Sequence, residues 1–92
     1  MTPPIRTKPS ARFIKSRAKL GEPIATRTDK ALRKFHESPE RPGLNFEAVK
    51  NLAGFFTIRV NRSFRIMLEQ REDEDGPYFL IVDVASHDDT YS

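Results

Sequence analysis

The sequence predicts an α+β domain in which an N-terminal strand and an antiparallel helix pair pack on one face of an antiparallel β-sheet. Two observations predict this class: apolar residues recur with a helical period in the first half and with the two-residue period of strands in the second half. The chain has 92 residues, which is enough for one hydrophobic core. We therefore expect a single domain over residues 1–92.

The N-terminal segment predicts a short strand followed by a helix. Three prolines among the first ten residues exclude a helix interior there and leave an extended segment over residues 5–7. Ser10 can cap the free amides of a helix over residues 11–20, and Gly21 ends it.

A second helix is predicted from residues 22–23, where a proline suits the first turn. Its apolar stripe has the spacing of one buried helix face and consists of Ile24, Thr28, Ala31, Leu32 and Phe35. Two prolines and a glycine within residues 38–43 end this helix, because they deny it hydrogen bonds and favour turns.

The second half predicts three or four strands. Residues 55–61 and 63–71 alternate apolar and polar side chains, so they should form a hairpin closed by a tight turn. The acidic segment 72–77 should be a solvated connection, and the apolar run 78–84 is typical of a central strand. Residues 45–50 could add a short strand before the hairpin.

Alternation along the hairpin separates its two faces. The face that the helices should cover carries Ile58, Val60, Phe64, Ile66 and Leu68. The opposite face carries Arg59 and Arg65, and like charges on neighbouring strands are destabilising without a shared counter-charge. We expect that charge to come either from Glu47, Glu69 and Asp83 or from an anionic ligand.

The composition excludes several kinds of site. There is no cysteine, and the two histidines, His36 and His87, make a metal site improbable, so we expect no metal and no cofactor. No apolar run approaches the ~18 residues of a membrane span, and no signal-peptide stretch begins the sequence, so we expect a cytoplasmic protein with no membrane partner.

Positive charge is concentrated in the first half. Residues 1–41 contain eleven Lys or Arg and four Asp or Glu, a net charge of +7, whereas residues 42–92 contain five and nine, a net charge of −4. Clustered cations suit a polyanion partner such as nucleic acid. They are equally what the solvated faces of helices would show.

The residues available for chemistry are acids, bases and cations. No phosphate-binding glycine loop, paired-histidine metal motif or serine nucleophile motif is present. The inventory of Glu47, Lys50, His87, Tyr91 and the two arginines suits RNA cleavage by the ribose 2′-OH, since the substrate then supplies the nucleophile. In the alternative interpretation Glu47 and Lys50 form a surface salt bridge and the other groups are solvated.

Two segments carry a resemblance to a known family. PGLNFEAVKNLAGFFTIRVNRSFRIML and the later IVDVASHDD, with the order of elements, resemble the RelE/ParE superfamily of toxins from bacterial type II toxin–antitoxin modules, especially its YoeB-like and HigB-like branches. The resemblance spans nearly the whole chain. It implies the RelE/ParE fold with the arrangement of strands and helices predicted above.

The resemblance also implies roles for individual residues. Glu47 falls where YoeB-like toxins have a general base, and Arg65 where RNA-cleaving members bind the scissile phosphate. Arg59 looks like a second phosphate contact, His87 like a general acid, and Tyr91 like a C-terminal tyrosine that stacks on or activates the substrate.

Lys50 and Arg62 are further candidate substrate-binding cations near this constellation. The acidic ending HDDTYS departs from the family pattern, because acids are unfavourable beside RNA phosphate. The implied function is a metal-independent mRNA interferase acting on the ribosome. Its implied partners are mRNA, the ribosome and a cognate antitoxin, with a homodimer or a toxin–antitoxin hetero-oligomer as the assembly.

Two other functions stay open, because the ParE branch has this fold and inhibits DNA gyrase without chemistry. The chain could be such an inhibitor, or a degenerate member that only binds an antitoxin.

Overall fold

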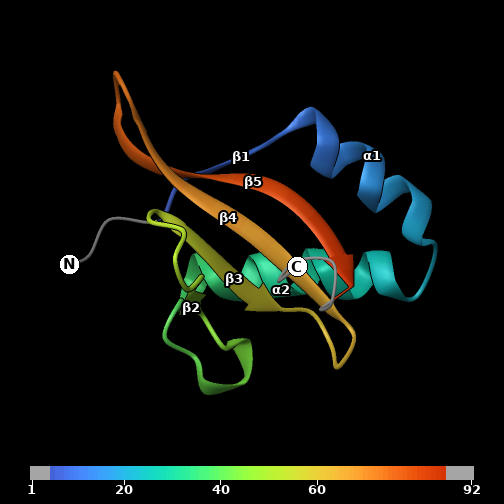
Figure 1. Ribbon diagram of the computed structural model, residues 1–92. Helices are drawn as coiled ribbons and strands as arrows, with labels where there is room; N and C mark the ends of the chain where they lie inside the picture. The colour runs from blue at the N-terminus through green and yellow to red at the C-terminus, as the bar shows by residue number, and fades with distance from the viewer. Residues whose placement is uncertain (1–4, 87–92) are drawn as a thin grey trace.

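The computed structural model describes residues 5–86 and confirms the α+β class (Figure 1). Two helices and a five-stranded, mostly antiparallel sheet make up these residues. In chain order the elements are β1 (Thr7–Pro9), α1 (Ala11–Leu20), α2 (Ile24–Glu37), the 3₁₀ turn η1 (Pro42–Leu44), β2 (Glu47–Ala48), β3 (Phe55–Arg59), β4 (Phe64–Asp73) and β5 (Gly76–Ser86).

The sheet has the strand order β1-β5-β4-β3-β2. The pairings β2–β3, β3–β4 and β4–β5 are antiparallel, whereas β1 runs parallel to β5. Helix α2 crosses behind the sheet in Figure 1, and α1 lies beside β5 near the edge that carries β1. Helix α2 therefore covers one face of the sheet.

The core lies between α2 and the sheet and is rich in phenylalanine. Phe35 of α2 is fully buried, with ring centroids 5.2 Å from Phe46 and 5.4 Å from Phe79. Phe56 stacks on Phe46 at 5.0 Å. These tilted, edge-on and stacked contacts are favourable aromatic geometries. The predicted helix-covered positions Ile58, Ile66 and Leu68 are also fully buried, while Val60 packs against the core from its margin.

A β-bulge in β5 receives the start of α1. The pairing of Met67 with Asp83 is followed by that of Leu68 with Ile81, so Val82 is an extra residue. The Ser10 hydroxyl donates a hydrogen bond to the Val82 carbonyl at 2.7 Å and accepts one from the Phe13 amide at 3.0 Å. The predicted helix cap is thus confirmed, and it also fixes α1 to the sheet.

An ion pair joins the two helices. Arg17 of α1 binds both carboxylate oxygens of Asp29 in α2, at 2.8 Å and 2.5 Å. This two-point geometry is the preferred one for a guanidinium and a carboxylate. The hydrogen bond and charge of Arg17 lower the pKa of the Asp29 carboxyl.

The strand boundaries differ from the predicted ones. The acidic segment 72–77 was expected to be a loop, yet β4 and β5 extend through most of it and leave only Glu74 and Asp75 between them. Gly76, at φ 111°, supplies the positive φ that begins β5. The first strand occupies residues 7–9 instead of 5–7, because the ladder with Phe79, Leu80 and Ile81 sets its register.

Asp73 near the end of β4 binds two cations of the N-terminal segment. Its carboxylate accepts hydrogen bonds from Arg6, at 2.8 Å and 3.1 Å, and from Lys8, at 2.6 Å. The Lys8 ammonium also lies 4.6 Å from the ring centroid of Tyr78, a cation–π distance. These contacts explain why a strand of three residues is held at the sheet edge.

We predict that this cluster makes stability depend on pH below about 4. Hydrogen bonds from Arg6 and Lys8 lower the pKa of the Asp73 carboxyl far below its ordinary value. Because the folded pKa lies below the unfolded one of about 3.9, the stabilisation is complete at higher pH and is lost as the pH falls toward the folded pKa. Asp73→Asn should lower the free energy of unfolding at pH 7 and flatten its fall between about pH 4 and pH 2.

Urea unfolding at a series of pH values would test this prediction. Glu74→Gln is the matched control, since Glu74 is an exposed acid in the same turn. An Asp73→Asn profile parallel to those of the wild type and the control would rule out the ion cluster as the source.

Among the helices of residues 5–86, none is long and apolar enough to cross a membrane.

Candidate functional site

The pairing register brings Glu47, Arg59 and Arg65 to the sheet face opposite α2. Arg59 of β3 pairs directly with Arg65 of β4, and Glu47 of β2 pairs with Thr57, two residues before Arg59. Directly paired residues share a sheet face, and diagonal neighbours lie about 7–8 Å apart, within reach of long side chains. The predicted juxtaposition of the two arginines is confirmed.

The turn between β3 and β4 holds the Arg65 guanidinium. Its Nη1 donates to the carbonyls of Asn61 at 2.7 Å and Phe64 at 3.1 Å. The Asn61 carboxamide oxygen shapes this turn by accepting from the amides of Ser63 and Phe64, both at 2.8 Å. Asn61 is therefore a positioning residue for Arg65. Sequence reasoning marked the turn and did not assign Asn61 this role.

Two of the three acids expected to neutralise the arginines, Glu69 and Asp83, pair with other residues. Glu69 forms an ion pair with Arg71 at 2.9 Å, and Asp83 forms one with Arg12 at 2.9 Å. Within residues 5–86, neither Arg59 nor Glu47 forms an ion pair. The ion pairs of the described residues thus give Arg59 no carboxylate as its counter-charge.

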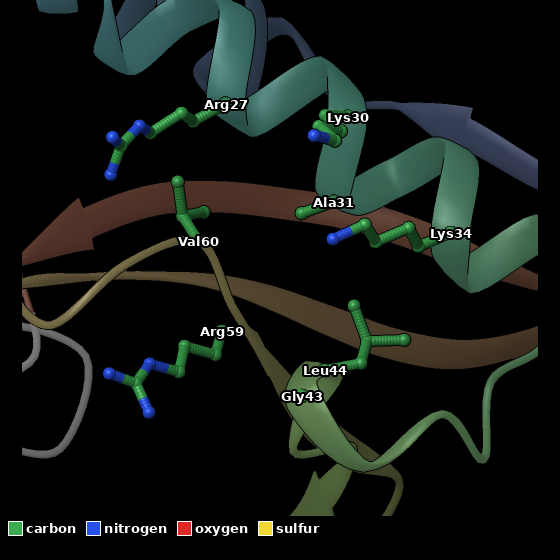
Figure 2. A pocket seen from close by; sticks show the side chains of 8 residues that line it. All are labelled: Arg27, Lys30, Ala31, Lys34, Gly43, Leu44, Arg59 and Val60. Atoms are coloured by element: carbon green, nitrogen blue, oxygen red, sulfur yellow. The ribbon is translucent and has the colours of Figure 1, made fainter.

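A pocket of about 280 Å³ opens beside this face, between α2, η1 and the end of β3 (Figure 2). Strand β2 pairs with Phe56 and Thr57 of β3 and does not reach Arg59. The turn η1 contacts both β3 and α2, and it forms one side of the pocket. The pocket is lined by the cations Arg27, Lys30, Lys34 and Arg59 and by Ala31, Gly43, Leu44 and Val60. Figure 2 shows Arg27 extending from α2 and Arg59 from β3 on the two sides of Val60.

Solved structures share this arrangement of helices and sheet. They include a YoeB/ParE toxin from Agrobacterium tumefaciens, with TM-score 0.71 and 11% identity, covering 90% of this chain and 99% of that one. The chain has the RelE/ParE fold. The YoeB dimer from Staphylococcus aureus gives TM-score 0.65 at 15% identity, covering 92% of this chain and 99% of that one.

The RelB–RelE antitoxin–toxin complex from Methanococcus jannaschii contains another similar chain, with TM-score 0.62 and 19% identity, covering 90% of this chain and 93% of that one. No protein-family model matches the chain, and no curated protein is significantly similar to it in sequence. The resemblance inferred from the sequence is thus confirmed at the level of the RelE/ParE fold.

The other predicted site residues divide into two groups on this RelE/ParE fold. Lys50 and Arg62 are exposed, in the β2–β3 connection and in the turn before Arg65. His87 and Tyr91 lie outside the described residues. Within residues 5–86, no group of three His, Cys, Asp or Glu side chains is placed to hold a metal ion.

Sequence reasoning missed the pocket. It assigned Arg27, Lys30 and Lys34 to the solvated face of α2, which is the ordinary position of helix cations. The RelE/ParE fold brings these cations beside Arg59, more than twenty residues later in the chain. The excess of positive charge in residues 1–41 was the one available signal.

Proposed function

We propose that this protein is the toxin of a toxin–antitoxin module and acts as an endoribonuclease on mRNA. The observation that carries the proposal is the register that aligns one carboxylate and two guanidinium groups on the sheet face opposite α2. Three solved structures with this fold are described as YoeB, ParE or RelE proteins. Two of these descriptions include the word toxin. These charges suit a phosphodiester and a proton acceptor beside it.

In the proposed reaction Glu47 removes the proton from a ribose 2′-OH. The 2′ oxygen attacks the adjacent phosphorus, and the bond from phosphorus to the 5′ oxygen of the next nucleotide breaks. The products are a 2′,3′-cyclic phosphate and a free 5′-OH, so atoms balance without another reactant. Arg65 stabilises the charge that develops on the phosphate oxygens, and Arg59 holds the substrate strand.

Two features of Arg65 suit this role. Its Nη1 is bound to the Asn61 and Phe64 carbonyls, which fixes the plane of the guanidinium. Within residues 5–86, Nε and Nη2 have no protein acceptor and stay available for a bidentate contact with phosphate. A group that is already oriented pays little reorganisation cost during the reaction. Arg65 thus combines a fixed position with unused donors.

The leaving 5′ oxygen needs a proton, which we assign to His87. An imidazole with a pKa near ~6.5 can donate a proton near neutral pH. Tyr91 is assigned to substrate stacking or activation, and Lys50 and Arg62 to the flanking strand. These four assignments are predictions from the sequence.

An antitoxin is the protein partner of this proposal, and we propose that it covers Arg59 and Arg65. The similar chain from M. jannaschii was solved in an antitoxin–toxin complex, and the one from S. aureus as a dimer. A disordered segment that folds on binding could cover the cations of this surface.

The proposal predicts that Glu47→Gln slows cleavage while RNA affinity is kept. Glu47 is exposed and outside the core, so the amide should not disturb folding. Loss of a general base costs about 10²–10⁴-fold in rate. The measurement is primer extension on a message translated in a cell-free system, where new 5′ ends report cleavage, combined with an RNA-binding titration.

Glu40→Gln is the matched control, since Glu40 is an exposed acid in the connection after α2. Cleavage by Glu47→Gln at the wild-type rate would remove Glu47 from the mechanism. An intact message with the wild-type protein would overturn the ribonuclease proposal and lead to a gyrase supercoiling assay. Cleavage without ribosomes would contradict only the expectation, implied by the family resemblance, that the protein acts on the ribosome.

A further inference from the structure

The pocket beside Arg59 gathers four cations and no acid. Arg27, Lys30 and Lys34 occupy positions i, i+3 and i+7 of α2, which lie on one helix face and span about 10 Å along the axis. Arg59 adds a fourth charge from β3. Among residues 5–86 none of these four cations has an ion-pair partner. Four cations that lack an ion pair within the described part of the chain, gathered around a pocket of about 280 Å³, attract an anion with several charges.

The floor of the pocket argues against an amphipathic helix as the ligand. Ala31 and Leu44 are only 5% and 2% exposed, because they already belong to the core. A helix that binds in a groove gains its affinity by burying apolar anchors, and this floor offers almost no apolar area for them. No aromatic side chain lines the pocket, so bases cannot stack there either. The remaining attraction is between the cations and a chain of negative charges.

The pocket is joined to the proposed cleavage site through Arg59. This residue lines the pocket and is also the direct pairing partner of Arg65. A strand whose scissile phosphate contacts Arg65 would therefore place a neighbouring phosphate at Arg59, and the following ones along α2. Guanidinium groups bind phosphate bidentately and ammonium groups bind it as point charges, and the pocket offers both.

We propose that the pocket formed by Arg27, Lys30, Lys34 and Arg59 binds consecutive backbone phosphates of the single-stranded RNA that is cleaved at Arg65. The inference rests on the proposed function, because it takes RNA as the ligand. It extends the substrate path from the open sheet face around the end of β3 to α2. The pocket contributes affinity without base preference, since phosphates carry no sequence information.

The test uses a fluorescein-labelled single-stranded oligodeoxynucleotide of about twelve nucleotides, which has no 2′-OH and cannot be cleaved. Its affinity is measured by fluorescence anisotropy over a range of salt concentrations. Lys30→Gln/Lys34→Gln should weaken binding about tenfold and reduce the slope of log K against log salt by about 1.4, since each lost contact to a single strand contributes ~0.7. The weakening should be equal for oligonucleotides of different sequence.

The matched control is Lys15→Gln/Lys19→Gln, which removes the same charge at the same spacing from exposed positions of α1. Circular dichroism should show that both double variants are folded. Equal weakening by the two would attribute binding to overall charge and overturn the proposal. An unchanged salt slope for Lys30→Gln/Lys34→Gln would also overturn it.

The partner class is tested with a poly-glutamate peptide. If Lys30→Gln/Lys34→Gln loses affinity for this peptide and keeps it for the oligonucleotide, the pocket binds an acidic protein and the proposal is wrong. Failure of the proposed function looks different: no RNA is cleaved, while oligonucleotide binding still depends on the pocket. Cleavage that depends on Glu47, with binding independent of Lys30 and Lys34, would overturn this inference alone.

Discussion

Arg65→Ala is expected to abolish measurable RNA cleavage while leaving the fold intact. Removing one preoriented donor to a developing oxyanion typically costs about 10²–10³-fold in rate, and the loss here includes a full positive charge. The substitution opens no cavity in the core, because Arg65 faces away from α2 and its pairing partners are Arg59 and Ala85. Cleavage is followed by primer extension on a translated message, and folding by thermal denaturation.

Arg65→Lys separates charge from geometry. Lysine keeps the positive charge and loses the fork that contacts two phosphate oxygens, so activity should recover only in part. Arg33→Ala, at an exposed α2 position that does not line the pocket, should cleave like the wild type. Full activity of Arg65→Ala would exclude Arg65 from the mechanism.

Phe35→Ala should have the largest effect on stability. The ring is fully buried and contacts Phe46 and Phe79, so its removal leaves a cavity between α2 and the sheet. Replacing a buried phenylalanine by alanine costs about 3–5 kcal/mol, against a total of about 5–15 kcal/mol for a typical domain. We expect a variant with a much lower unfolding midpoint and a substantial unfolded fraction at 37 °C.

Urea titration followed by circular dichroism measures this loss. Leu52→Ala is the control, because Leu52 is a large apolar residue that is 44% exposed, and its truncation should change the free energy of unfolding by less than about 0.5 kcal/mol. A loss below about 1 kcal/mol for Phe35→Ala would show that the surrounding phenylalanines collapse into the space.

The sequence predicted the fold through local signals. Ser10 and Gly21 bound α1 where capping chemistry places its ends, and the stripe that ends at Phe35 faces the sheet. The alternation along β3 and β4 assigned Arg59 and Arg65 to one face, and the register confirms it. Such features depend on neighbours in the chain, which a single sequence displays.

What the sequence could not predict depends on contacts between distant segments. The sequence predicts a loop at Asp73, and the role of this residue follows only from its contacts with Arg6 and Lys8, more than sixty residues earlier. The pocket likewise forms only when the fold brings α2 beside Arg59. No periodicity or local motif in the sequence indicates such long-range contacts.

The extra residue at Val82 separates two pairing registers within β5. With strict alternation from Ile81 onward, Asp83 would pair with Ile66 on the core face and Val84 would pair with Arg65. The bulge absorbs one residue, so Val84 enters the core and Ala85 becomes the small neighbour of Arg65. The first half of β5 can therefore keep its register with β1, while the second half pairs with β4 in a register shifted by one residue. Chain length at this single point decides which residues border the proposed catalytic arginine.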